Sequence, residues 1–547
     1  MTFSRVFHTI RHLLPVQIYG RPLFALRRMF SSSGNPGRLS QLAAELKTRL
    51  LLQPPEKLEL KFLNRSHQFK TSEMQWQTGH FSDRPEKLWI YNLNYFAWLH
   101  DGQTETHSPQ NLFLILDWIE KNNSPRAETW EPYPLSRRVT EWVRWCREHP
   151  ALDEDAEDCI VSSITLQCQR LRNDLEYHIQ ANHLLENLKA LFVATVFLAE
   201  YEEGVTPESE SLIEFCIDEL VEQIRLQIMQ DGGHFERSPM YHVEMLHAVE
   251  SVRAANRKLL ELDGISQNLS RKIARMAMLC GDRIPLMRDW LAVMTHPDGK
   301  IAQFNDSALK TGISRDWKTM NYLLEHSGFF VRHTPECYFV LSCGDPSPTF
   351  QPGHSHCDIL SYELSLNGER CIVDTGCGSY QNAEIRYECR RTEAHNLPMI
   401  EHAEQSDIWG TFRIGRRARV THRSYDSEHG MLVVEFIDQY GQHYRREVIF
   451  LHQQIKIRDR LTQRRVTGTF ISLLHLAPGA LVIPENRPST TSFSIGNNVL
   501  SVTTEANLRT APYIWYPAFG KPVNSEKLIL SNPQAEAIDY VISWQTT

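Results

Sequence analysis

The stretch Gly353-His354-Ser355-His356-Cys357-Asp358-Ile359-Leu360 indicates how the second half of the chain folds. Two histidines one residue apart share a face only on a β-strand, because side chains alternate there, whereas on a helix they diverge. Apolar and polar residues continue to alternate from Leu360 to Leu366, and Asn367-Gly368 is a type I′ hairpin signal. We therefore expect a strand over both histidines and a hairpin that returns toward Asp374.

This hairpin would gather several ionisable side chains. His354, His356 and Asp374 come together through the turn, and His395 follows about twenty residues later. Such a group is either a metal site or an acid/base site. A run of surface histidines is the simpler alternative, but packing alone does not explain a glycine-flanked pair with a returning aspartate.

Length and composition limit the class of protein. The 547 residues exceed what one core accommodates, so two or three domains are expected. The net charge of −8 shows no basic bias, which argues against a nucleic-acid partner. The eleven cysteines are odd in number and lack a CxxC pair, and most occupy apolar positions, so we interpret them as core residues. A dense disulfide framework is excluded, although one bridge is not.

The N-terminal segment, residues 1–38, is basic and amphipathic. Met1 to Phe30 has no continuous apolar region, so it does not resemble a cleavable signal peptide, and no stretch reaches the ~20 apolar residues of a membrane span. The segment either docks on an anionic membrane face or packs as a helix, and we favour packing. Ser31 to Gly37 forms a break after it.

Hydrophobic periodicity divides the rest of the chain. Residues 39–328 repeat apolar side chains at helical spacing, with faces such as Leu112 to Ile119 and Val139 to Cys146. Residues 329–547 change to a period of two, as in Met431 to Phe436 and Tyr540 to Trp544. Helices followed by short strands predict a helical domain and then a β-sandwich, with the cleft between them as the default ligand site.

Two helical motifs outside the hairpin carry polar groups. Asn182, His183 and Glu186 project from one side of a largely apolar helix; a solvated surface is the simpler interpretation, but a buried helix needs a wet environment on that side. Pro239 starts a second helix, so Tyr241 and His242 lie in its first turns. A Tyr-His pair there either packs in a core or moves protons in a cleft.

An aromatic and basic cluster forms the last group. Trp130, Tyr133, Arg137 and Arg138 lie close together in sequence. Aromatic faces stack on sugar rings, and arginine pairs bidentately with carboxylate or sulfate. Packing between helices accounts for some of these residues. The segment Phe304-Asn305-Asp306 would add a loop to the histidine hairpin.

These motifs together resemble the heparinase II/III family of polysaccharide lyases. The resemblance rests on Asn182-His183 with Glu186, Ser238 to His242, His354 to Asp358 with Asp374, and His395-Asn396, in this order. It covers the chain from about residue 40. It implies an incomplete α/α toroid followed by an antiparallel β-sandwich.

The resemblance also implies β-elimination at the 4-linked bond of a uronic-acid polysaccharide. Such an enzyme must neutralise the uronate, remove the C5 proton and protonate the leaving O4. Asn182 or His183 would hold the carboxylate with support from Glu186. Tyr241 would be the acid, with the role of base also open to it, and His354 would be the other proton-transfer group. A structural Zn²⁺ would bind His356, Asp374 and His395, and no organic cofactor is expected. The residues expected to contact the polymer are Trp130, Tyr133, Arg137, Arg138, His242, Asn305 and Asn396.

Substrate and compartment are inferred more broadly. Few basic residues in the expected cleft favour a substrate that is not highly sulfated, such as a bacterial exopolysaccharide or capsule. The resemblance favours the periplasm or cell envelope, whereas the missing leader favours the cytoplasm. A glycoside hydrolase, which needs two carboxylates facing across the cleft, is one alternative. A catalytically silent carbohydrate-binding protein is the other.

Overall fold

The computed structural model describes residues 3–30, 36–69, 74–77, 87–100, 108–124, 127–315, 319–483, 489–533 and 535–546. They form two compact units whose sequences interleave. Unit 1 contains Met1–Leu13, Gln227–Glu244 and Pro285–Thr547, and unit 2 contains Leu14–Leu226 and Met245–Ile284. Most of the predicted break from Ser31 to Gly37 lies outside the described residues, and the predicted boundaries at 38 and 328 stay predictions.

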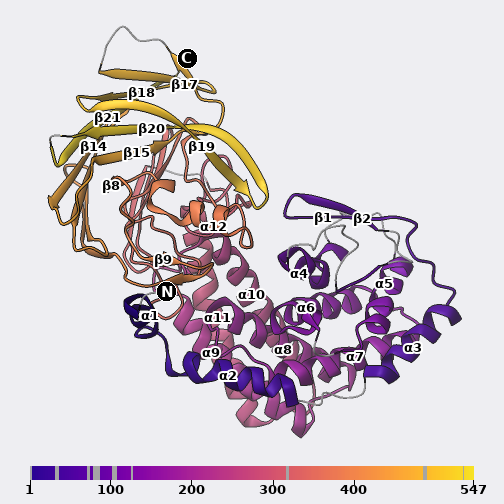
Figure 1. The fold of residues 1–547 in the computed structure, drawn as a ribbon. Coiled ribbons are helices and arrows are strands. Elements are labelled where there is room, and N and C mark those ends of the chain that lie inside the picture. Colours follow the sequence, from indigo (N-terminus) through magenta and orange to yellow (C-terminus); the bar gives the residue numbers. More distant parts are fainter. Residues whose placement is uncertain are drawn as a thin grey trace. The chain divides into compact units, whose positions relative to one another are not determined.

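Unit 2 is mainly helical (Figure 1). Its α-helices are α2 (Pro15–Phe30), α3 (Pro36–Arg49), α4 (Lys87–Tyr95), α5 (Ser108–Lys121), α6 (Pro132–Glu148), α7 (Glu154–Asn173), α8 (Ala181–Tyr201), α9 (Pro207–Gln227) and most of α10 (Pro239–Leu259) and α11 (Gln267–Val293). The part of unit 2 that the structure describes also contains two 3₁₀ turns, η2 (Ala97–Leu99) and η3 (Glu128–Trp130), and a hairpin of β1 (Leu58–Phe62) with β2 (Arg65–Phe69).

Local sequence chemistry explains where these helices begin. Pro132 opens α6 at a position where its missing N–H costs nothing. The Asp153 side chain caps α7 by accepting a hydrogen bond of 3.2 Å from the backbone N–H of Ala156. The helical repeats of the sequence correspond to α3, α5, α6, α7, α9 and α10, which confirms those predictions. The expected buried helix is α8, whose side chains are nearly all inaccessible.

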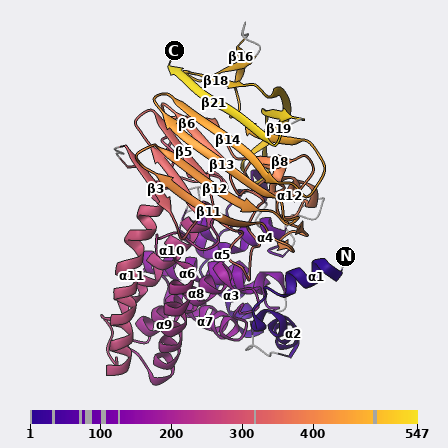
Figure 2. The ribbon, with the colours of Figure 1, turned by 90° about the vertical axis from the view of Figure 1, so that its left-hand side faces the viewer.

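Unit 1 is built mainly from antiparallel sheets. A five-stranded sheet has the order β3-β4-β5-β6-β7, an eight-stranded sheet β11-β12-β13-β14-β21-β18-β17-β16, and a four-stranded sheet β19-β20-β15-β8. Figure 2 shows β11 to β14 side by side in the larger sheet. The strands are β3 (Met320–Leu324), β4 (Phe329–His333), β5 (Cys337–Ser342), β6 (Tyr362–Leu366), β7 (Glu369–Ile372), β8 (Pro398–Ile400), β9 (Ile408–Trp409), β10 (Arg413–Ile414), β11 (Arg419–Asp426), β12 (Met431–Ile437), β13 (His443–Leu451), β14 (Gln454–Gln463), β15 (Phe470–His475), β16 (Leu481–Ile483), β17 (Thr490–Ile495), β18 (Asn498–Thr504), β19 (Asn507–Ala518), β20 (Lys521–Asn532) and β21 (Ala537–Thr546).

One apolar core joins the three sheets. It includes Phe339 of β5, Val434 of β12 and Leu473 of β15, all inaccessible to solvent. Unit 1 also contains α1 (Phe3–Ile10), α12 (Ala383–Arg390) and the 3₁₀ turn η4 (Thr392–Ala394). All eleven cysteines of the chain are buried and free, which confirms their interpretation as core residues.

The expected hairpin forms, but its first strand is shorter than predicted. Strands β6 and β7 pair through Asn367 and Gly368, whose positive φ angles of 48° and 90° fit a type I′ turn. The prediction of a strand over His354 and His356 is wrong, because both lie in a loop before β6. The loop's backbone N–H groups are satisfied elsewhere: His356 donates to the Asn305 side chain and Cys357 to the Arg390 carbonyl.

Within the described ranges, no helix combines the length and the apolar character that crossing a membrane requires.

Candidate active site

An aromatic pair from two distant segments forms the centre of the candidate active site in unit 1. Tyr241 lies in the first turn of α10, where its backbone N–H donates to the Ser238 hydroxyl at 3.2 Å. The ring of His354 stacks on that of Tyr241, with centroids 3.9 Å apart and planes inclined by 13°. The structure thus brings together the two residues expected to transfer protons.

Glu236 fixes the orientation of His354. Its carboxylate, which is 1% exposed, contacts Nδ1 of His354 in a short hydrogen bond. A carboxylate accepts rather than donates, so the proton of a neutral imidazole is placed on Nδ1 and the Nε2 lone pair stays available. The composition of the segment before α10 did not reveal this role.

Tyr380 lies next to the Tyr241–His354 pair. Its hydroxyl is 3.1 Å from that of Tyr241, and its ring centroid is 6.3 Å from that of His354. Burial raises the pKa of Tyr241 well above its usual value, and the nearby charges of Asp306 and Glu236 raise it further. Tyr241 is therefore protonated at neutral pH, as a general acid must be.

Asp306 supports the loop that carries His354. Its backbone N–H donates to the His354 carbonyl at 3.1 Å, and its carboxylate accepts from Nε2 of His356 at 2.8 Å. Arg386 of α12 forms a two-pronged ion pair with the same carboxylate and also donates to the Gly353 carbonyl at 3.1 Å. Burial alone would raise the pKa of Asp306, but Arg386 and His356 hold it far below its usual range.

Two residues predicted to contact substrate are held by hydrogen bonds within unit 1. Asn305, at a left-handed φ of 58°, accepts from the His356 backbone N–H and donates to the Arg237 carbonyl. His242 is fully buried, with Nε2 2.9 Å from the Met287 carbonyl and Nδ1 accepting from the His234 backbone N–H. Burial lowers the pKa of His242 to about 3, so it is neutral.

The three residues expected to hold zinc are buried close together, but each has its own contacts. The rings of His356 and His395 are 5.4 Å apart, and Asp374 accepts a 2.7 Å hydrogen bond from Nδ1 of His395. Among the described residues, no group of three or more His, Cys, Asp or Glu side chains is arranged to hold a metal ion. Nδ1 of His356, Nε2 of His395 and one oxygen of Asp358 are buried without hydrogen bonds, so donor atoms of suitable chemistry are present.

Unit 2 carries the remaining predicted catalytic residues. Asn182 and His183 lie in the first turn of α8, next to Gln180 and Ala181, whose φ angles of 70° and 55° are unusual for these residue types. Nδ1 of His183 lies 3.0 Å from the carboxylate of Glu176, and its ring lies 4.5 Å from that of Tyr133. A carboxylate thus orients this histidine as Glu236 orients His354.

Glu186 is further along α8 and has different partners. Its carboxylate is 2.6 Å from the Lys189 ammonium and 3.8 Å from Arg137. The carboxylate in contact with His183 is therefore Glu176, which the sequence interpretation did not single out. Arg137 is partly exposed and lies over the ring of Tyr95 at 5.8 Å.

Three further residues expected to contact the polymer lie inside the protein. Trp130 is 2% exposed and donates to the Asn122 carbonyl at 2.9 Å. Arg138 is inaccessible, stacks on Trp118 at 3.8 Å and donates to Gln167. Asn396, also inaccessible, donates to the backbone carbonyls of β6 and of the loop after β7. Solvent does not reach these side chains, so in this structure they pack the interior rather than line a surface.

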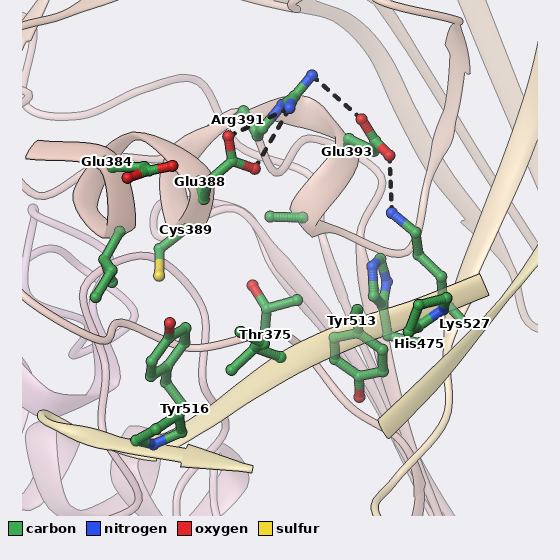
Figure 3. A pocket seen from close by; sticks show the side chains of 15 residues that line it. Thr375, Glu384, Glu388, Cys389, Arg391, Glu393, His475, Tyr513, Tyr516 and Lys527 are labelled. Atoms are coloured by element: carbon green, nitrogen blue, oxygen red, sulfur yellow. Dashed lines mark hydrogen bonds and ion pairs between the residues drawn. The ribbon is translucent and has the colours of Figure 1, made fainter. Parts of the chain in front are cut away.

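A cavity of about 600 Å³ lies on the other side of α12 (Figure 3). Glu384, Glu388 and Cys389 of α12 line it, whereas Arg386 of the same helix reaches Asp306. Its cations are ion-paired with the protein's own carboxylates: Glu393 is 3.1 Å from Arg391 and 2.8 Å from Lys527. Helix α12 therefore separates this cavity from the candidate active site.

Comparisons with known proteins identify the fold and the family. The structure is similar to that of a heparinase III, with a TM-score of 0.65 and 17% identity over 97% of this chain and 90% of that one. It is also similar to a heparan sulfate lyase from Pedobacter heparinus, with a TM-score of 0.58 and 14% identity over 96% and 88% of the two chains. The fold is thus an incomplete α/α toroid followed by an antiparallel β-sandwich.

Family models match most of the chain. The heparinase II/III N-terminus covers residues 61–326 and the heparinase II/III-like C-terminal domain covers residues 319–545. The chain belongs to the heparinase II/III family, a family of polysaccharide lyases.

Two relatives match this chain over only part of their own length. The FtsZ-localized protein C of Caulobacter vibrioides is 24% identical over 321 residues, 57% of this chain and 52% of that protein. A heparin-sulfate lyase of Bacteroides stercoris is 25% identical over 256 residues, 40% of this chain and 35% of that protein. The matched regions thus span about half or less of these relatives.

Proposed function

We propose that this protein cleaves a uronic-acid-containing polysaccharide by β-elimination. The observation that carries the proposal is the Tyr241–His354 pair, in which a protonated phenol and an imidazole with a free nitrogen lie side by side. An elimination needs one group to remove the C5 proton and another to protonate O4. These two side chains supply both functions from adjacent positions.

His354 is the base in this scheme. Glu236 holds the Nδ1 proton, so Nε2 takes the C5 proton and the imidazolium that forms stays beside a buried carboxylate. The carboxylate stabilises the positive charge as it develops, and the pair needs no reorganisation during the reaction.

Tyr241 is the acid. It donates its proton to the leaving O4 and becomes a phenolate. The hydroxyl of Tyr380, 3.1 Å away, donates a hydrogen bond to that phenolate and stabilises it. The proton taken by His354 is returned to Tyr241 through solvent before the next cycle.

The resemblance assigns neutralisation of the uronate to Asn182 and His183. Asn182 donates from its side-chain amide and His183 from Nε2 when protonated, while Glu176 holds Nδ1 of His183. Asn182→Ala should reduce kcat more than it raises KM, because the carboxylate hydrogen bond strengthens as charge moves onto it in the transition state.

A structural zinc ion belongs to the proposal as well. His356, Asp374 and His395 would hold it, and its chemistry would be to fix the loop between His354 and β6 rather than to activate substrate. Metal analysis of the purified protein tests this: about one zinc per chain is expected in wild type and less than about a tenth of that in His395→Ala.

The substrate is proposed to be a surface polysaccharide of a bacterium, such as an exopolysaccharide or capsule, encountered in the periplasm or cell envelope. The net charge of −8 supports a polymer with less negative charge than a highly sulfated one. Introducing Tyr241→Phe in the host, which removes the Tyr241 hydroxyl, should lengthen that polymer.

A hydrolase is disfavoured by the carboxylates of unit 1. Asp306 is closed off between Arg386 and His356, and Glu236 is engaged with His354. Neither is placed as one of two opposed carboxylates that a glycosidase requires. A silent carbohydrate-binding protein is the second candidate, because the name of the FtsZ-localized relative gives a location rather than a reaction.

The test is ultraviolet absorbance of unsaturated uronates during incubation with polyuronates, glycosaminoglycans and host exopolysaccharide. Wild type is compared with Tyr241→Phe and His354→Ala. A rise in absorbance that both substitutions abolish supports elimination. New reducing ends without absorbance would favour a hydrolase, and binding without cleavage of any polymer would favour the silent protein.

A further inference from the structure

Helix α2 of unit 2 presents an apolar face to solvent. Ile18, Tyr19, Leu23 and Leu26 are 53%, 55%, 44% and 51% exposed. With Pro15 and Pro22 they recur at the three- and four-residue spacing that places side chains on one side of a helix. Contiguous exposed apolar side chains on a soluble protein usually mark an interaction surface.

The opposite face of α2 attaches the helix to unit 2. Phe24 packs on His178 with ring centroids 4.2 Å apart, and a Cβ atom at Gly20 would lie only 3.1 Å from that of His178. Gln17 is 2% exposed, and its side chain caps the helix by accepting from the Leu14 backbone N–H at 2.9 Å. These contacts hold the inner face of α2 against the rest of unit 2. The exposed apolar face therefore belongs to a helix that is packed in place.

The charged side chains of α2 itself have one sign. The helix contains three arginines, Arg21, Arg27 and Arg28, and no aspartate or glutamate, although the whole chain has a net charge of −8. Arg21 and Arg27 are exposed on α2. The nearby carboxylate of Asp174 is buried and ion-paired with Arg170 at 2.6 Å; burial raises its pKa, and the charges of Arg170, Arg28 and Arg27 oppose that rise.

We propose that α2 docks the protein on the surface of an anionic lipid bilayer. The sixteen-residue helix, about 24 Å long, would lie parallel to the membrane. Ile18, Leu23 and Leu26 would enter the boundary between headgroups and acyl chains, Tyr19 would sit at the headgroup level, and Arg21 and Arg27 would contact lipid phosphates.

The arginines of α2 favour an anionic lipid surface over a second copy of the chain as the partner of the exposed face. A second copy of the chain would bring the same arginines against one another, which opposes association through this face. A bilayer with anionic lipid complements both the apolar stripe and the arginines beside it. A single helix of this size gives reversible attachment rather than permanent insertion.

Vesicle flotation of the full chain tests the proposal. The probes are phosphatidylcholine vesicles with and without about 30% phosphatidylglycerol. The face variant combines Ile18→Ser with Leu26→Ser, and the charge variant combines Arg21→Gln with Arg27→Gln. The control combines Leu226→Ser with Met278→Ser, which removes two other exposed apolar side chains of unit 2 (49% and 71% exposed).

Wild type and control should float with the anionic vesicles and bind neutral vesicles at least about tenfold more weakly. The face and charge variants should each lose about tenfold or more of the binding to anionic vesicles, with thermal unfolding unchanged. Added salt should release the wild type. Equal binding by the face variant and wild type would overturn the proposal. So would absence of vesicle binding together with a change from dimer to monomer in the face variant, which would assign this surface to a second copy.

Discussion

The imidazole of His354 lies flat on the phenol ring of Tyr241, with ring centroids 3.9 Å apart. The two residues come from the loop before β6 and from the first turn of α10. A hydrogen bond from Asp306 to the His354 backbone and one from Tyr241 to Ser238 hold these segments, and the Ser238 hydroxyl itself donates to the Asp306 carbonyl at 2.6 Å. The proposed proton acceptor, His354, and the proposed donor, Tyr241, are thus connected through one short segment at Asp306.

Removing the Tyr241 hydroxyl should abolish most of the activity. Tyr241→Phe keeps the ring that stacks on His354, so folding should be unaffected, while the loss of a general acid should lower kcat by about 10²–10⁴-fold. The release of unsaturated product measures this. Tyr513→Phe is the matched control, because it removes a hydroxyl that donates to the Leu476 carbonyl at 2.6 Å. Equal losses in both variants would contradict the assigned role.

Glu236→Gln should lower kcat while changing KM little. The amide keeps the shape of the side chain but no longer stabilises the imidazolium of His354 in the transition state, so a decrease of about 10–10³-fold is expected. Steady-state kinetics over a range of polymer concentrations separates kcat from KM. A rise in KM with unchanged kcat would show that Glu236 binds substrate instead of positioning His354.

Breaking the buried pair of Asp306 and Arg386 should destabilise unit 1. In Arg386→Ala the Asp306 carboxylate loses its arginine and keeps the hydrogen bond of His356, which is neutral because burial lowers its pKa to about 3. Loss of one member of such a buried pair typically costs about 3–5 kcal/mol. Thermal or urea unfolding measures the change. Arg464→Ala removes an exposed arginine 2.9 Å from Glu536 and should cost no more than about 1 kcal/mol. Similar unfolding midpoints in the two variants would refute the structural role of the buried pair.

Mild acid should weaken the fold through two buried histidines. Burial lowers the pKa of His242 to about 3 and that of His234 to about 4, whereas both would titrate near 6.5 in the unfolded chain. As the pH falls below about 6.5 the unfolded state binds protons first, so the free energy of unfolding decreases, by up to about 1.4 kcal/mol per pH unit for each histidine, until the folded pKa is reached.

Urea unfolding between about pH 6.5 and pH 4.5 tests this pH dependence. His242→Gln removes one of the two groups, so its stability should be lower at neutral pH but should fall less steeply with acid. His452→Gln changes an exposed histidine and should retain the slope of wild type. A slope in His242→Gln as steep as in wild type would exclude the buried histidine as a cause.

The fold was largely predictable because its signals are local. Helical spacing anticipated α5 to α7, alternation anticipated β12 and β21, and the Asn367-Gly368 pair anticipated the turn between β6 and β7. The strand over His354 and His356 failed because side-chain and backbone partners distant in sequence, at Asn305 and Arg390, take up the loop's backbone hydrogen bonds. Alternation does not register such partners.

The site was only partly predictable for the same reason. Tyr241 and His354 stood out through their motifs, but the roles of Glu236 and Tyr380 depend on contacts across 118 and 139 residues. Trp130 and Arg138 have the residue types of a sugar-binding surface, yet packing places them in a core. The type of a residue shows which interactions its side chain can make. It does not show whether the side chain is exposed to solvent.

The interleaving of the two units limits where the two family domains can be exchanged between homologous genes. The two family domains meet between residues 319 and 326, whereas unit 1 takes Gln227–Glu244 from the preceding domain. A recombination event at that junction would leave Glu236 and Tyr241 from one parent beside His354 and Tyr380 from the other. The two segments are therefore expected to diverge in step among descendants, and chimaeras should stay active only when residues 227–244 are exchanged together with the sandwich.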